Sequence, residues 1–135
     1  NVFPMPIESP SHGARSIVNA PWNDALNASP FGWHDDNGLA GDEYNYTRGN
    51  NVWAQEDRNG NDSIGHSSIG LDFNFPLDFG LSVAANEDAA ITNLFYWNNI
   101  MHDVWYQYGF DELSGNFQAN NYANGGQGND YVSWP

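Results

Sequence analysis

The four histidines of this chain are its best candidates for metal or acid–base chemistry, and their spacing excludes a zinc-protease helix. They are His12, His34, His66 and His102. No two of them stand four positions apart around a glutamate, the spacing that puts two imidazoles on one helical face. The sequence contains no lysine and no cysteine, which excludes a phosphate-binding P-loop, a Schiff base, disulfides and thiolate ligands. No catalytic residue is therefore predicted within the chain.

One acidic loop has the spacing of a calcium-binding loop. Asp57, Asn59 and Asn61 place oxygen ligands at alternate positions, as at the start of an EF-hand loop, and Asp62 follows directly. The loop departs from that pattern because Asp62 replaces the expected glycine and Ser68 replaces the bidentate glutamate. The sequence predicts a weak calcium site formed by Asp57, Asn59, Asn61 and Asp62, with an ordinary acidic turn as the alternative.

Two histidines have a further interpretation. We expect His102 to be a core histidine that is hydrogen-bonded within the protein, and Asn98, one helical turn earlier, is a candidate partner. The alternative is a group that supports a nearby metal site. His34 precedes Asp35 and Asp36, and this run predicts a solvated acidic loop, with a surface ion site as the alternative.

The elements that must position these residues divide the chain into four regions. They are a loop region broken by prolines (residues 1–44), a region of short strands (44–81), a helix (86–108), and a Gly/Asn-rich loop followed by a strand (109–135). Leu71–Phe75 alternates with period two, and a further strand is predicted to start at Tyr131. The expected fold class is α+β, with a loop-rich N-terminal half, short antiparallel strands and one long buried helix.

The predicted helix has recognisable ends and apolar residues on several faces. Asn86 is the expected N-cap, Glu87 and Asp88 place negative charge in the first turn, and Gly109 supplies the left-handed position after the last turn. A helix that is apolar nearly all round is normally wrapped by the rest of a larger protein. We therefore expect the isolated chain to expose a large apolar patch and to associate with itself or with a partner.

Composition limits the classes of partner. The chain has 135 residues, the length of one domain, and a formal net charge of −14. Such a surface repels nucleic acid and anionic membranes, and no apolar run approaches the ~20 residues of a membrane span. We expect neither kind of partner.

A series of short motifs resembles the fungalysin-type secreted metallopeptidases. The motifs are Pro10–Ser16, Tyr46–Val52, Asp88–Tyr96, Met101–Asp103, Tyr108–Phe110, Gly115–Gln118 and Gly128–Asp130. None is specific alone, but their order and spacing match the family along nearly the whole chain. Ser133–Pro135 departs from the expected continuation.

The resemblance implies a thermolysin-like catalytic unit, of which this chain is an incomplete, N-terminal part. In that family one zinc ion is held by two histidines and a downstream glutamate, and a glutamate between the histidines activates water. Those residues would follow Pro135, so the implied zinc ligands lie outside this chain.

The implied function is a secreted zinc endopeptidase that cleaves protein or peptide substrates. The implied partner of this chain is the remainder of the catalytic domain, and the chain alone is expected to be inactive. The alternative is a self-contained extracellular binding module, in which six tryptophans and seven tyrosines form a carbohydrate-stacking face stabilised by calcium. Burial of the aromatic residues discriminates between the two.

Overall fold

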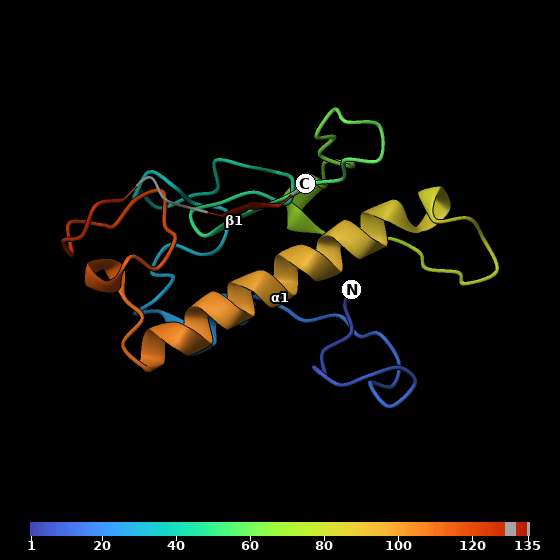
Figure 1. Ribbon diagram of the computed structural model, residues 1–135, viewed down its shortest axis with the longest axis horizontal. Helices are drawn as coiled ribbons and strands as arrows, with labels where there is room; N and C mark the ends of the chain where they lie inside the picture. The colour runs from blue at the N-terminus through green and yellow to red at the C-terminus, as the bar shows by residue number, and fades with distance from the viewer. Residues whose placement is uncertain (129–131, 135) are drawn as a thin grey trace.

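One long helix organises the molecule. The structure, a computed structural model, describes residues 1–128 and 132–134. Within that part, α1 (Glu87–Gln107) is the long helix, and β1 (Val52–Ala54) and β2 (Val132–Trp134) are strands of three residues each. Short 3₁₀ turns occur at Pro21–Ala25, Ile69–Leu71, Ala84–Asn86 and Glu112–Ser114. In Figure 1, α1 crosses the middle of the molecule, with the N-terminal loops on one side and β1 on the other.

The two strands pair in parallel. Val52 lies opposite Val132, and Ala54 lies opposite Trp134. Parallel strands need a long crossover, and α1 lies in the segment that joins these two. Antiparallel pairing is found in the described residues only as isolated bridges, Val2–Ser16, Arg48–Trp53 and Glu56–Ser63. The prediction of short antiparallel strands is therefore wrong for β1 and β2.

The alternating stretch Leu71–Phe75 is not a strand. Leu71 has a φ of 59°, a left-handed conformation that is incompatible with an extended ladder. The predicted strand near the chain end is present as β2, and its predicted start at Tyr131 lies outside the described residues. The fold is a small, loop-rich α+β arrangement with little strand.

The N-terminal end of α1 lacks the side-chain cap that the sequence predicts. Asn86 makes no side-chain capping bond to the helix. Its amide donates to the carbonyls of Asp78 and Ser82, and its Oδ1 accepts the N–H of Asp78 at 2.9 Å. Asn86 therefore closes the preceding loop, while Glu87 and Asp88 place negative charge in the first turn, as expected.

The C-terminal end of α1 follows the sequence expectation. Gly109 has a φ of 89°, and its N–H donates to the carbonyl of Tyr106 at 3.1 Å. The N–H of Phe110 reaches back to the carbonyl of Trp105, also at 3.1 Å. This pair of bonds is the Schellman arrangement, which needs a left-handed residue after the helix.

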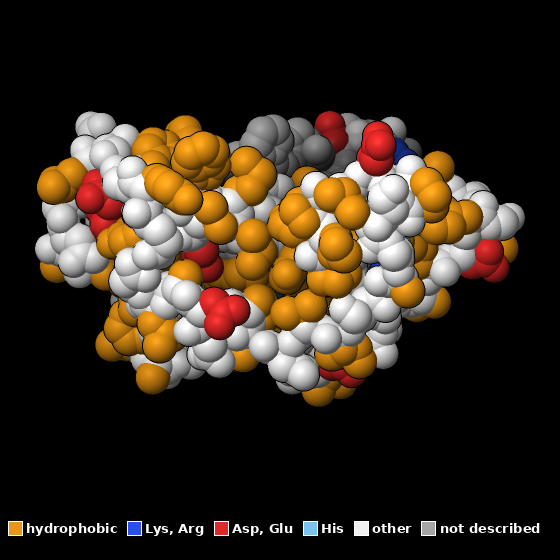
Figure 2. All heavy atoms as spheres, turned by 90° about the horizontal axis from the view of Figure 1, so that it is seen from below, with side chains coloured by type: hydrophobic (Ala, Val, Ile, Leu, Met, Phe, Trp, Pro, Cys, Tyr) orange, Lys and Arg blue, Asp and Glu red, His pale blue; other side chains and the backbone are white. Residues whose placement is uncertain are grey.

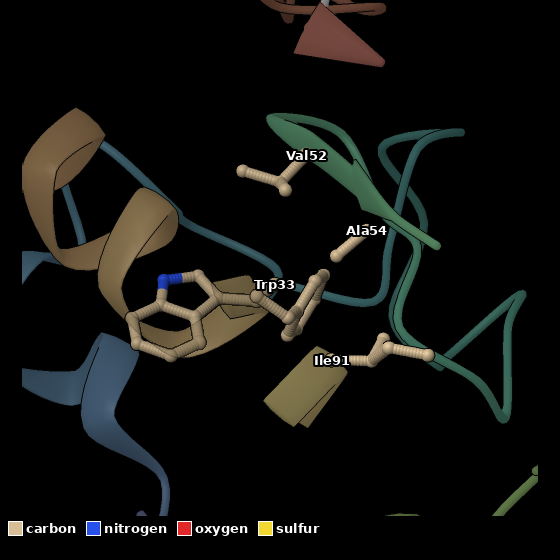
Figure 3. Packing of buried hydrophobic residues seen from close by; sticks show 5 residues of the cluster. Trp33, Val52, Ala54 and Ile91 are labelled. Atoms are coloured by element: carbon tan, nitrogen blue, oxygen red, sulfur yellow. The ribbon is translucent and has the colours of Figure 1, made fainter. Parts of the chain in front are cut away.

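The hydrophobic core lies between α1 and β1. Figure 3 shows Val52 and Ala54 projecting from one face of β1 toward Trp33 and Ile91. Alternate residues of a strand share a face, and Ile91 and Phe95 share a face of α1 because they are four positions apart. This small core contacts α1 along one side.

The rest of α1 is not covered. Its buried residues are Ala89, Ile91, Thr92, Phe95, Asn99 and Asp103. Met101, Val104, Trp105 and Tyr108 are exposed, Tyr108 by 80%. Core residues lie against one side of the helix only, and the apolar surface that we expect the isolated chain to expose lies on the rest of it. Figure 2 shows a broad area of hydrophobic side chains on one face of the molecule, with a few acidic groups among them.

Among residues 1–128 and 132–134, no helix combines the length and the apolar character that a membrane crossing requires.

Candidate functional site

Asp103 is the centre of a buried polar network on the inner side of α1. Its Oδ1 accepts the hydroxyl of Ser29 at 2.7 Å, and its Oδ2 accepts the indole N–H of Trp33 at 2.8 Å. His102 Nδ1 lies 3.0 Å from the same Oδ1. A carboxylate that is only 4% exposed is tolerated because these donors replace water.

His102 extends the network toward the loop after α1. Its Nε2 lies 3.2 Å from Oε1 of Gln118 and 3.3 Å from Nδ2 of Asn116. The interpretation of His102 as a hydrogen-bonded core histidine is confirmed. The expected partner is wrong, because the Asn98 amide donates to a carbonyl of its own helix at 2.8 Å.

Buried asparagines connect α1 to the segment before β1. Asn51 Nδ2 lies 3.2 Å from the Ser29 hydroxyl and 3.3 Å from Oδ1 of Asn99 on α1. Asn50 exchanges two bonds with the backbone of Asn120, at 2.8 and 2.6 Å. The role of these asparagines could not be recognised from the sequence, because asparagine in a polar loop is typical of turns, and its distant partners appear only in the fold.

The outer side of α1 presents a regular seam. Leu94, Asn98, Met101, Trp105 and Tyr108 are spaced alternately four and three residues apart, and we call them the outer seam. This is the 3.5-residue repeat by which one helix packs along another at a shallow angle. The four apolar members are 37–80% exposed. The seam therefore has the repeat of a helix-packing surface, and the described part of the chain leaves it open.

A groove beside the outer seam has polar atoms without partners. Its volume is about 270 Å³, and its walls include Val52, Met101 and Trp105. Asn51 and Asn116 also line it, and the side-chain Oδ1 of each is buried with no hydrogen-bond partner among the described residues. The groove therefore combines apolar walls with two buried acceptors that no described residue satisfies.

The structure places the four predicted calcium ligands on one exposed turn. The Glu56–Ser63 bridge brings the ends of this turn together. Asp57 Oδ1 accepts the N–H of Asp62 at 3.3 Å, so one carboxylate also holds the turn itself. Asn59 and Asn61 are exposed on the same turn.

His34 does not lie in a solvated loop. It is 4% exposed, and Asp35 is fully buried. The ring of His34 stacks on Phe73 with centroids 5.3 Å apart and an interplanar angle of 7°. Burial lowers the pKa of His34 to about 4. The predictions of a solvated loop and of a surface ion site are both wrong, because aromatic side chains distant in sequence cover this segment.

The residues present do not fit a zinc site. In residues 1–128 and 132–134, no group of three or more His, Asp or Glu side chains could hold a metal ion. Both ring nitrogens of His102 contact protein partners, and His34 lies among aromatic rings.

Comparison with known proteins shows which family this chain resembles. The family model of fungalysin metallopeptidase matches residues 1–134. Extracellular metalloproteinase 5 of Trichophyton rubrum is 42% identical over 136 residues, a match that covers 97% of this chain and 21% of that protein. Extracellular metalloproteinase 2 of Trichophyton tonsurans is 37% identical over 135 residues, with the same coverage. The chain thus spans about a fifth of the length of the curated relatives it matches. The chain belongs to the fungalysin family of metallopeptidases.

Proposed function

We propose that this chain is the N-terminal part of the thermolysin-like catalytic unit of a secreted zinc endopeptidase. Family membership and the extracellular metalloproteinase names of its relatives support this proposal. The zinc ligands and the glutamate that activates water belong to the part of the relatives' length that this chain does not span. The substrates are proteins or peptides, and the chain alone is inactive.

The outer seam is the observation that carries the proposal. A stripe with a 3.5-residue repeat on an exposed helix calls for a packed second helix, and the neighbouring groove has two unpartnered acceptors. The occupant we propose is a helical segment of the remaining catalytic region. The inner network around Asp103 holds α1 against Trp33 and Ser29, so the seam is presented by a fixed helix.

Split-chain reconstitution tests this function. The chain is mixed with the remaining catalytic region of the same enzyme, expressed separately, and hydrolysis of a quenched fluorescent peptide is followed in the presence of zinc. We expect no hydrolysis and no stoichiometric zinc with the chain alone, and hydrolysis with the mixture. Trp105→Asp in the outer seam should remove the reconstitution.

The matched control is Leu39→Asp, which places the same charge at a residue that is 69% exposed and outside the seam. It should reconstitute activity as the wild type does. Hydrolysis or bound zinc with the isolated chain would contradict the proposal, as would full reconstitution by Trp105→Asp.

The alternative, a carbohydrate-binding module, has less support. Trp105 of α1 and Tyr108, the residue directly after the helix, are exposed, and their rings are inclined at 62° to each other. These two residues belong to the 3.5-residue repeat of the outer seam, which suits knobs on a packed helix. Trp33, which could have contributed, is 3% exposed.

A further inference from the structure

Asn98 is the polar member of the outer seam. The other four members, Leu94, Met101, Trp105 and Tyr108, are apolar and exposed. In the heptad notation for packed helices, their spacing places Asn98 and Trp105 at a positions and the remaining three residues at d positions. A single asparagine at an a position is known to fix the register of packed helices, at a cost in stability.

The side chain of Asn98 has a defined orientation and an open acceptor. Its Nδ2 donates to the carbonyl of Leu94 at 2.8 Å. The reverse placement of the amide would set two oxygens against each other, so Oδ1 is the atom turned away from that carbonyl. Oδ1 has no hydrogen-bond partner among the described residues, and it is not enclosed, in contrast to the Oδ1 atoms of Asn51 and Asn116. A group from outside can therefore reach it.

The groove beside the outer seam places this acceptor where a covering helix would lie. Asn98, Met101 and Trp105 all line the groove, and the last two are more than half exposed. A helix packed on Met101 and Trp105 would therefore also remove Oδ1 of Asn98 from water. An acceptor that is buried without a donor costs the desolvation of that group, so a well-matched helix must offer a donor at this point.

The positions that flank the seam carry no charge that could take over this role. In paired helices, the e and g positions beside the seam set the partner and its orientation through ion pairs. Here these positions are occupied by Phe95, Trp97, His102, Val104 and Gly109. Both ring nitrogens of His102 contact Asp103 and Gln118 within the protein. Asn98 is therefore the polar feature of this surface that can select a register.

The covering helix is best assigned to the remaining catalytic region. The chain spans about a fifth of the length of its relatives, so most of the enzyme lies outside it. A second copy of this chain is a poorer occupant, because each copy carries a net charge of −14 and the two would repel each other.

We propose that Asn98 fixes the register of the covering helix by accepting a hydrogen bond from an N–H or O–H donor side chain on that helix. Apolar side chains on either side of the donor pack on the rest of the outer seam. Asn98 is thus a specificity-determining residue of this surface, because other registers leave its oxygen buried and unpaired. The inference rests on the proposed function, since the covering helix belongs to the remaining catalytic region.

The sign of one substitution, measured in two proteins, tests the proposal. In the chain of residues 1–135 at low concentration, Asn98→Leu should leave the midpoint of urea denaturation unchanged or raise it. Asn98 bonds only to its own helix there, and leucine has the higher helix propensity. In the complete enzyme, with autolysis suppressed by a reversible inhibitor, the same substitution should lower the midpoint by about 0.3 M or more, because the donor on the covering helix loses its acceptor.

Two further variants separate the lost acceptor from other effects. Asn98→Ala adds no bulk to the seam and should show the same reversal of sign, since alanine also has a higher helix propensity than asparagine. Gln107→Leu is the matched control, because it too replaces an exposed amide of α1 by leucine. Gln107 lies on another side of the helix, where it bonds to Asn27, so its substitution should have the same effect in both proteins.

The complete enzyme decides the outcome. A midpoint that Asn98→Ala leaves unchanged or raises would overturn the proposal, because no donor would then face this position. A loss with Gln107→Leu that is confined to the complete enzyme and equals that with Asn98→Leu would also overturn it. Failure of the proposed function is distinguishable, because it appears as a wild-type mixture that does not hydrolyse peptide, whereas failure of this inference leaves that reconstitution intact.

Discussion

At the scale of single residues, Asp103 is the group on which the position of α1 depends. Its two oxygens accept from Ser29 and Trp33, which lie four positions apart in the loop after the Pro21–Ala25 turn, and His102 lies beside it. Residues of this kind are hard to identify from sequence. An aspartate on a helix normally faces water, and only its partners show that this one is buried.

Asp103→Asn should destabilise the fold by about 2–3 kcal/mol. Asparagine has the same shape, but it replaces one acceptor oxygen with a donor, so Ser29 or Trp33 would face another donor. Urea denaturation measures the free energy of unfolding. Asp24→Asn, an exposed site in the Pro21–Ala25 turn, is the control and should change it by less than about 0.5 kcal/mol. Equal losses in the two variants would contradict the assigned role of Asp103.

His34 should make stability depend on pH in the acidic range. Burial lowers its pKa in the folded state to about 4 from the ordinary value of 6.5, so the unfolded chain binds the proton more readily. The stability associated with the neutral ring is fully present above pH 6.5 and is lost as the pH falls toward 4, by about 3 kcal/mol in total.

Urea denaturation at pH 7.5 and pH 4.5 measures this effect. His34→Phe should show a smaller loss of stability between the two pH values than the wild type, because the titrating group is gone. The same slope in wild type and His34→Phe would show that other groups cause the pH dependence.

At the scale of elements, the end of α1 offers a test free of packing effects. Gly109 has a φ of 89°, and a Cβ built on it meets nothing within 4 Å. Gly109→Ala should therefore cost about 1 kcal/mol through backbone conformation alone, and Gly109→Asn should cost less, because asparagine tolerates the left-handed region. Urea denaturation of both variants checks the order. A cost for Asn equal to or above that of Ala would contradict the Schellman assignment.

The turn from Asp57 to Asp62 is the element for which we propose calcium. Asp57, Asn59, Asn61 and Asp62 are together on this exposed turn, and carboxylate and amide oxygens suit a hard cation at millimolar affinity. Thermal unfolding of the wild type should move to higher temperature in millimolar calcium, and that of Asp57→Ala should not.

Asp42→Ala is the matched control, because Asp42 is also exposed and lies outside the turn. It should retain the response to calcium. Equal midpoints for the wild type with and without millimolar calcium would identify Asp57–Asp62 as an ordinary acidic turn.

At the scale of the whole molecule, the open seam predicts association. The isolated chain should form dimers or larger species at high concentration, because Met101, Trp105 and Tyr108 are more than half exposed on one helix. Sedimentation velocity measures this. Met101→Glu should shift the population toward monomer, because a charge in the seam costs desolvation, while Leu39→Glu should not. A monodisperse wild-type monomer at high concentration would contradict the prediction.

Local signals in the sequence predicted the features that depend on residues close together along the chain, such as the ends of the helix. The bounds of α1 follow from its apolar content, from acidic residues in the first turn and from Gly109, and the structure has the helix at Glu87–Gln107. The family could also be recognised from the sequence, because the order and spacing of its motifs can be compared without knowing which residues are in contact. The match to the family model confirms it.

Tertiary structure alone decided the partners and the burial. The side chains of Ser29 and Asp103 are 74 positions apart, and those of Asn51 and Asn99 are 48 apart, so no local window contains either pair. The alternation of Leu71–Phe75 predicted a strand, yet Leu71 takes a left-handed conformation. Phe73 also stacks on a histidine that the sequence placed in water. Periodicity in the sequence indicates which residues favour burial. Which surfaces come into contact depends on desolvation and hydrogen bonding between groups that can be far apart in the sequence, so only the folded chain decides it.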